Sequence, residues 1–422
     1  MDGKAVAEYA SDLQLGLRQQ DVPEYKAIRK IGMSAVLAMN IRGLDEINYR
    51  ILQMAAPFYF GIPSYVLDDI VSVLEEIEFI KVVRKADDIV SIIPDVPFYE
   101  DVFHVVGDYA STQKLREVEQ LTVSILEKLQ QAPQNVDTLA ASLGADTKLF
   151  KTSIGIAEKG GLLLKKRARG KDILVSPLYF SDSLEALADL AARGDSKRLQ
   201  RLISLISSMQ GMPLSLIRQK KEIKGTALSA EDIAILEVMA ADGILKPPRI
   251  VRPDNTSEDF IFTPQPGSAR LNPARREIYE KAMALAAAVR KGELLPEAYR
   301  IRNPQALLAS FQQKKFLRAN TEATHQYKNL SVMNLGKLRK VGGGFSEFHL
   351  IDIDENHEAI KIAKQLLAGR TDIDTNIDPN AIITLSSDEE YVRSQISRMT
   401  VAASATIISD ESKKELEQLW LF

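Results

Sequence analysis

The spacing of hydrophobic residues predicts helices that are joined to short β-hairpins. In a helix that begins near Glu117, Leu121, Ile125 and Leu129 recur every four positions, which places them on one face. The apolar runs that follow are short and lie between Gly, Pro or charged residues, as in the strands of a small hairpin. In chain order we expect helices at 136–143 and 147–159, then strands at 162–164 and 173–175 around a turn at 168–171.

The segment 144–146 has the composition of a tight turn between two helices. Gly144 can adopt the left-handed backbone conformation that favours the end of one helix, and Asp146 can cap the start of the next. The polar N-terminal half of that next helix is expected to face solvent. The side chains expected to face the core are Leu149, Phe150, Ile154 and Ile156.

The same order of elements recurs elsewhere in the chain. An earlier copy spans about 47–93, with a long helix at 65–78 and a hairpin after it, and a third copy spans about 197–263. A long helix is expected between Pro273 and Lys291. A fourth, degenerate copy would then consist of a helix at 305–313 and strands at 329–333 and 345–353, followed by a helix at 355–367.

Length and composition fit a globular protein of several domains, because the chain has 422 residues, 45% of them hydrophobic and 26% charged. The predicted fold class is mainly α with small β-hairpins (α+β), as tandem domains joined by helices. The expected domains are N-terminal helices with an acidic copy (1–110), a basic copy (111–194), a third copy (195–270), a helical region with the degenerate copy (271–370), and an acidic linker with a C-terminal helix (371–422).

Charge is distributed unevenly along the chain, although the net charge is only −3. Residues 1–110 hold 10 Lys and Arg against 18 Asp and Glu, and residues 352–422 hold 7 against 14. The segment between them holds 37 against 25, a net charge of +12. A basic centre of this size is typical of a surface that binds a polyanion, and chance clustering of charges on solvated helices is the alternative.

Two elements of the basic copy hold most of the candidate phosphate contacts. Its third helix begins with Thr and Lys side chains, and its hairpin carries five cations against one anion. Such a hairpin can neutralise phosphates along a groove, and an Arg at its tip can enter a narrow minor groove. The candidate nucleic-acid-binding residues are Thr147, Lys148, Lys151, Thr152, Lys165, Lys166, Arg167, Arg169 and Lys171, together with Arg218, Lys220 and Lys221 of the third copy.

Residues 117–176 resemble the winged helix-turn-helix superfamily of DNA-binding domains, through the turn at Gly144, the helix that begins at Thr147 and the basic wing at 165–171. The resemblance implies that one helix recognises duplex DNA in the major groove while the wing contacts the DNA beside it. Few long amide or Arg side chains lie on that helix, which favours contacts to the phosphate backbone over base readout.

The copy at 47–93 has the opposite charge. The helix that would enter a groove holds five carboxylates, which phosphates would repel, so this copy is expected to pack or to contact protein. The carboxylates are Asp68, Asp69, Glu75, Glu76 and Glu78.

No enzyme, cofactor or metal is predicted. The chain has no Cys, which excludes disulfides, thiolate nucleophiles and Cys-ligated zinc, and it lacks HExxH, GxSxG and GxGxxG motifs. Imidazole and carboxylate groups can hold a metal. A metal-dependent hydrolase is therefore a third hypothesis, based on the HxxDxDxxH run of His349, Asp352, Asp354 and His357. A simpler interpretation of Asp354 is that it caps the start of a helix. Two other features have structural interpretations: His104 is expected to lie in the core, and the glycines at 342–344 to form a turn.

The ends of the sequence bear on partners and location. The first residues do not show the basic region followed by an apolar region that is typical of a secretion signal, and no run of about 20 apolar residues is seen. We therefore expect a cytoplasmic protein without a membrane span. A C-terminal apolar cluster, expected to dock on its own chain or on a partner, comprises Leu416, Leu419, Trp420, Leu421 and Phe422.

The leading functional hypothesis is a regulator, initiator or DNA-loading subunit that binds double-stranded DNA mainly through its phosphates. The alternative is a non-enzymatic scaffold subunit whose winged helices contact protein partners through the acidic copy or the C-terminal helix.

Overall fold

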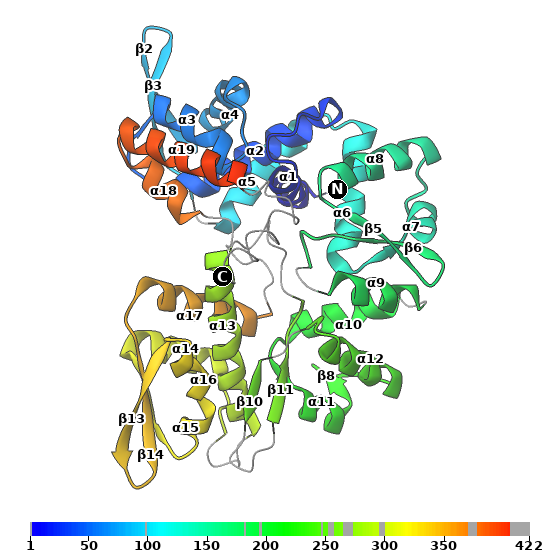
Figure 1. Cartoon of the computed structure of the whole chain (residues 1–422), viewed down its shortest axis with the longest axis vertical. Coiled ribbons are helices and arrows are strands. Elements are labelled where there is room, and N and C mark those ends of the chain that lie inside the picture. Colours follow the sequence, from blue (N-terminus) through cyan, green and yellow to red (C-terminus); the bar gives the residue numbers. More distant parts are fainter. Residues whose placement is uncertain are drawn as a thin grey trace, which may run out of the picture. The chain divides into compact units, whose positions relative to one another are not determined.

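The structure, a computed structural model, divides the chain into two compact units (Figure 1). One unit comprises Met1–Gln120 and Asn376–Phe422, and the other comprises Leu121–Thr375. The end of the chain therefore belongs to the N-terminal unit. The structure describes residues 2–97, 99–180, 183–193, 196–245, 248–251, 257–264, 273–294, 300–369 and 378–405.

Three helices pack against one another in the N-terminal unit: α1 (Gly3–Leu17), α2 (Lys26–Ile41) and α5 (Tyr99–Thr112). Glycine allows α1 and α5 to approach closely, because a Cβ atom at Gly107 would lie 2.6 Å from the backbone nitrogen of Lys4. The buried carboxylate of Glu119, near the start of α6 (Glu117–Gln131), accepts the backbone N–H groups of Ala27 and Ile28 at 2.8 and 2.9 Å. Glu119 thus joins α6 to the start of α2.

The same unit contains a small antiparallel sheet in which β3 lies between β1 and β2. Its elements are β1 (Ile47–Asn48), α3 (Tyr49–Tyr59), α4 (Leu67–Glu76), β2 (Ile80–Lys85) and β3 (Asp88–Pro94). Two helices from the end of the chain, α18 (Pro379–Leu385) and α19 (Glu389–Ala405), pack on α3. The hydroxyl groups of Tyr59 and Thr384 lie 2.9 Å apart in a hydrogen bond between α3 and α18.

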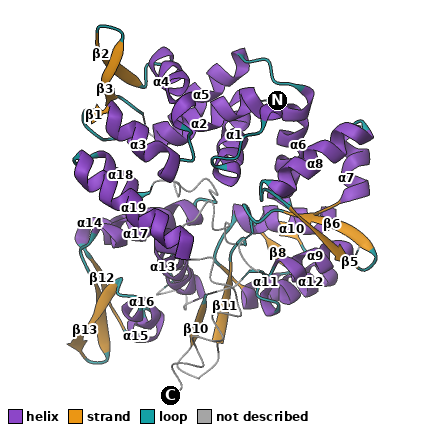
Figure 2. Cartoon of the chain, turned by 45° about the horizontal axis from the view of Figure 1, so that its top comes forward, coloured by secondary structure: helices purple, strands orange, loops and turns teal. Residues whose placement is uncertain are grey.

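The second unit begins with a similar arrangement, in which β6 lies between β4 and β5. After α6 come β4 (Gln134–Asn135), α7 (Val136–Leu143), α8 (Thr147–Lys159), β5 (Leu164–Ala168) and β6 (Lys171–Val175). The next helix, α9 (Leu184–Ala192), packs along the β5–β6 hairpin (Figure 2). The predicted bounds of α7 and α8 are confirmed, and Gly144 ends α7 in the left-handed conformation with φ at 57°.

A third sheet follows, in which β11 lies between β7 and β10. Its segment comprises α10 (Ser196–Ser208), β7 (Met212–Pro213), α11 (Leu214–Lys220), a small hairpin of β8 (Glu222–Ile223) and β9 (Thr226–Ala227), α12 (Ala230–Ala241), β10 (Arg249–Val251) and β11 (Ser257–Ile261). Ser229 and Asp232 form a capping box at the start of α12.

The fourth sheet has β14 between β12 and β13, and it shares a hydrophobic core with two long helices. Phe348 of β14 is fully buried, and its ring lies 5.9 and 5.2 Å from the rings of Phe311 and Tyr327. The segment comprises α13 (Pro273–Lys291), α14 (Pro304–Lys314), β12 (Phe316–Asn320), α15 (Ala323–Gln326), α16 (Lys328–Val332), β13 (Gly336–Gly342), β14 (Phe345–Leu350) and α17 (Asp354–Leu367).

The four three-stranded sheets thus have one topology: the last strand in sequence pairs with the two earlier ones, and helices separate the first strand from the closing hairpin. We call these segments the first (47–94), second (117–175), third (196–261) and fourth (304–350) repeats. The prediction of a mainly helical α+β protein with small hairpins is confirmed.

Several local predictions were wrong. The segment 329–333 is not a strand but lies largely in the short helix α16. Leu330 is the one buried residue of this helix, which packs on β13. In the second repeat, β5 begins at Leu164 rather than at 162. Leu162 and Leu163 are buried but precede the strand. In the first repeat, the predicted helix at 65–78 is shorter, and its start is a 3-10 turn at Ser64–Val66.

Burial also differs from expectation at some positions. His104 is exposed, because the buried face of α5 is formed by its neighbours Val102, Phe103 and Val106. In α8 only Phe150 of the four expected core residues is fully buried, and Ser153 and Ala157 complete its inward face. Asp354 is the first residue of α17 rather than its N-cap, which is Ile353.

Candidate nucleic-acid interface

The N-terminal half of α8 presents a polar, cationic surface. Thr147, Lys148, Lys151 and Thr152 are all exposed, and with Asp146 they line a shallow hollow. Lys148 and Lys151 are three residues apart, so their side chains leave the same face of the helix. Within the described residues, neither ammonium group has a hydrogen-bond or ion-pair partner. Both are therefore available to an anion from outside.

The start of α8 is closed by its own cap. Asp146 Oδ1 accepts the backbone N–H groups of Lys148 and Leu149 at 2.9 and 3.0 Å. The cap satisfies two of the backbone donors that a helix N-terminus otherwise offers to a phosphate. Phosphate contact at this helix would therefore come from the Lys and Thr side chains.

The five cations of the β5–β6 hairpin, in contrast, all have partners within the chain. Two of them, Lys165 and Arg167, form ion pairs with Asp172, each at 2.8 Å. Lys171 Nζ donates to the backbone oxygen of Ala192 at 3.1 Å. The remaining two pair with α9: Lys166 Nζ lies 2.6 Å from Glu185 Oε1, and Arg169 Nε lies 2.7 Å from Asp189 Oδ1. Three carboxylates thus offset part of the charge of this hairpin, where the sequence predicts an open cationic surface.

These ion pairs also affect the acids. The hydrogen bonds from Lys165 and then Arg167 lower the pKa of Asp172, and the hydrogen bond from Lys166 lowers that of Glu185. Arg169 lowers the pKa of Asp189 in the same way. Carboxylic acids with lowered pKa values are ionised at neutral pH, so all three carboxylates compete with phosphates for the hairpin cations.

The third repeat places its candidate cations at the end of α11. Arg218 donates from Nε to Glu237 Oε1 of α12 at 2.6 Å, which occupies this guanidinium. Lys220 and Lys221 are exposed, and Lys221 ends the helix in the left-handed conformation. Of the three predicted contacts in this repeat, only these two lysines remain without an ion pair among the described residues.

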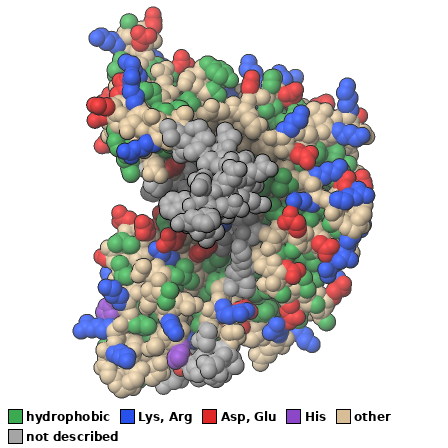
Figure 3. All heavy atoms as spheres, in the orientation of Figure 1, with side chains coloured by type: hydrophobic (Ala, Val, Ile, Leu, Met, Phe, Trp, Pro, Cys, Tyr) green, Lys and Arg blue, Asp and Glu red, His purple; other side chains and the backbone are tan. Residues whose placement is uncertain are grey.

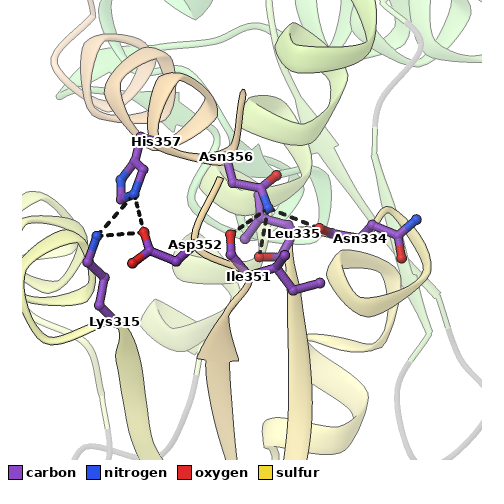
Figure 4. Close-up of polar contacts among 7 residues, drawn as sticks. All are labelled: Lys315, Asn334, Leu335, Ile351, Asp352, Asn356 and His357. Carbon is purple, nitrogen blue, oxygen red and sulfur yellow. Dashed lines mark hydrogen bonds and ion pairs between the residues drawn. The ribbon is translucent and has the colours of Figure 1, made fainter. Parts of the chain in front are cut away.

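The four side chains of the HxxDxDxxH run do not meet at one point. Figure 4 shows two of them, Asp352 and His357, beside Lys315. His357 Nε2 lies 2.5 Å and Lys315 Nζ 2.9 Å from Asp352 Oδ1, so a cation already occupies this carboxylate. The hydrogen bonds from Lys315 and then His357 lower the pKa of Asp352. His349 instead pairs with Glu347 at 2.8 Å. No group of three or more His, Asp or Glu side chains in the described part of the chain is arranged to hold a metal.

The chain matches no family model, no curated protein and no solved structure. Across the residues with described structure, no helix has both the length and the apolar character needed to cross a membrane. The predicted partner-binding residues Leu416, Leu419, Trp420 and Phe422 lie outside the described residues.

Proposed function

We propose that this protein binds double-stranded DNA through winged-helix domains and contacts it mainly at phosphates. The observation that carries the proposal is the pair of unpartnered lysines, Lys148 and Lys151, on the exposed N-terminal half of α8. In the helix-turn-helix arrangement, the second helix of the pair docks into the major groove by this end. The repeated strand order of the four sheets supports the winged-helix interpretation.

The ion pairs of the hairpin refine this proposal. Because its five cations have internal partners, we assign the primary contact to α8, and the wing takes a smaller part than its composition indicates. The hydroxyl and ammonium groups of the Thr and Lys side chains of α8 suit phosphate contact better than bidentate base recognition. Binding is therefore expected to depend steeply on salt and weakly on DNA sequence.

A Lys148→Ala/Lys151→Ala variant tests the proposal by fluorescence anisotropy with a labelled duplex at several salt concentrations. Each lost phosphate contact lowers the slope of log K against log salt by about 0.9, so the double variant should lose about 1.8. Lys159→Ala is the matched control, because this exposed lysine lies on the same helix about 12 Å beyond Lys151 along the helix axis. An equal slope in the native protein and the double variant would refute the assignment to α8.

A second candidate function, protein contact, is favoured by the first repeat. Its hairpin exposes three aliphatic side chains, Val83, Val90 and Ile93, beside the acidic helix α4. The acidic helix opposes DNA, while exposed apolar groups rimmed by charge suit a protein partner. A co-purifying protein that is lost from a Val83→Ser/Val90→Ser variant would support this role, and retention of that protein would exclude the hairpin as its contact.

A further inference from the structure

The fourth repeat has a sheet face that the sequence does not single out. On the inner face of this sheet, Leu317, Phe348 and Leu338 contact the core. Because side chains alternate along a strand, their neighbours lie on the opposite, outer face. The outer face therefore carries Phe316 and Arg318 of β12, Lys337 and Arg339 of β13, and Phe345, Glu347 and His349 of β14.

The registers bring these side chains into rows across the sheet. Phe316, His349 and Lys337 are direct cross-strand neighbours, and Arg339 lies opposite Glu347. The rings of Phe316 and His349 are stacked, with centroids 5.6 Å apart and planes 19° from parallel. Beyond these rows, at the end of the hairpin, Phe345 is 46% exposed, which is unusual for so large an apolar side chain. Aromatic rings and cations are thus interleaved on one open surface.

The cations of this face are free, in contrast to those of the second repeat. Arg318, Lys337 and Arg339 are exposed, and no hydrogen bond or ion pair engages them within the described residues. The one acid of the face, Glu347, is instead paired with His349. Figure 3 shows Lys, Arg and His side chains gathered over the β13–β14 hairpin, at its lower left. The cations of this face are therefore open, whereas each cation of the β5–β6 hairpin has a partner within the chain.

We infer that this outer face is a binding site for single-stranded nucleic acid. Proteins that bind single strands combine a positive surface, which follows the phosphates, with rings on which unpaired bases stack. Both groups are present here within one small sheet, and Lys337 and Arg339 lie about 6.7 Å apart along β13. A duplex offers no unpaired base to the rings, and an acidic peptide would use the cations alone. Unpaired bases are the ligand groups that use both.

This site would lie in a different repeat from the proposed duplex contact at α8. The inference does not require the duplex proposal, and the two can fail separately. If both hold, the protein binds paired and unpaired strands through different repeats. A protein of this kind would suit the boundary between a duplex and an opened strand.

The test uses the whole 422-residue chain and a labelled oligothymidylate of about 20 nucleotides, which has no duplex structure. Phe345→Ala removes one exposed ring and should weaken binding at least about fivefold, the lower end for loss of one stacked base. Lys337→Ala/Arg339→Ala should lower the salt slope by about 1.4, since each phosphate contact contributes about 0.7 for single strands. Lys361→Ala, an exposed lysine of α17 away from the sheet, is the control and should bind as the native protein does.

Two comparisons make the outcome decisive. The Phe345 and Lys337/Arg339 variants should bind a duplex of the same length as tightly as the native protein, whereas Lys148→Ala/Lys151→Ala should weaken duplex binding alone. Far-UV circular dichroism of each variant should match the native spectrum, because all the substituted side chains are exposed.

The inference is overturned if the oligothymidylate fails to bind at low salt, or if the Phe345 and Lys337/Arg339 variants bind it as tightly as the native protein. It is also overturned if polyglutamate of equal charge competes as well as the oligothymidylate, because stacking would then add nothing. Loss of single-strand binding alone leaves the duplex proposal in place, and loss of duplex binding alone leaves this inference in place.

Discussion

The ion pairs between the β5–β6 hairpin and α9 lead to a gain-of-function prediction. A Glu185→Gln/Asp189→Asn variant removes the two acids that hold the hairpin cations Lys166 and Arg169, and Asp189 also pairs with Arg193 just after α9. If α8 docks on duplex DNA, the hairpin lies beside the phosphates, and its released cations can reach them. Two added contacts make the slope of log K against log salt steeper by about 1.8. The affinity of the variant relative to the native protein should then grow about tenfold as salt falls from about 200 to about 50 mM.

The assay is an anisotropy titration of a labelled duplex over that salt range, with a control for total charge. Asp137→Asn/Glu158→Gln removes two exposed acids of the same repeat that form no ion pair in the described structure, so it changes net charge equally and releases no cation. Folding stability should change little in either variant, because exposed ion pairs contribute little. Equal slopes for the two variants would refute the reasoning, since release of the hairpin cations would then have no effect beyond charge.

Three further predictions concern the fold. Gly107→Ala should destabilise the N-terminal unit by about 1–3 kcal/mol, because the added Cβ overpacks against α1. Gly155→Ala in α8, where an added Cβ meets no atom within 4 Å, should instead stabilise the protein by about 0.5–1 kcal/mol. Urea unfolding measures both changes, and equal effects would contradict the packing argument. Phe348→Ala should cost about 3–5 kcal/mol of the unfolding free energy of the second unit in the same assay, and a loss below about 1 kcal/mol would show that the core refills the space. Burial raises the pKa of Asp232, but the hydrogen bonds from Arg201 and Ser229 outweigh burial and lower this pKa overall. The ionised Asp232 therefore stabilises the fold at pH values above its unfolded-state pKa of about 3.9. This contribution is lost as the pH falls through the lowered pKa of the folded state. Asp232→Asn should therefore lower the urea midpoint at pH 7 more than at pH 3, and an equal loss at both would exclude the ionised carboxylate as the cause.

Local sequence signals predicted the elements best where they act over a few residues. The bounds of α7 and α8 follow from Gly144 and Asp146, because a left-handed glycine and a capping carboxylate determine helix ends by short-range hydrogen bonds. The short helix α16 was misread as a strand, because a five-residue segment with one buried residue gives no period to count. The helices α18 and α19 were missed because their stabilising contacts are with α3, more than 300 residues earlier.

The candidate site shows the same limit for charge. The sequence identifies the cations at 165–171, but their partners Glu185 and Asp189 belong to a helix that only the fold brings beside the hairpin. Conversely, the sequence shows Lys337 and Arg339 in a cationic stretch with Lys340, but it does not show which face of a sheet they share. Only the register of β12, β14 and β13 shows that they are free and lie beside aromatic rings. A signal was present in the alternation of Phe345, Glu347 and His349, which marks one face of a strand.

Binding of nucleic acid by the basic repeats is measured by titrating the native 422-residue chain against a labelled random-sequence duplex at several salt concentrations. We expect micromolar or tighter binding at low salt and a steep loss of affinity as salt rises, since the proposed contacts are to phosphates. Absence of binding at low salt would contradict the proposal, and the unpaired lysines of α8 would then belong to a protein-contact surface.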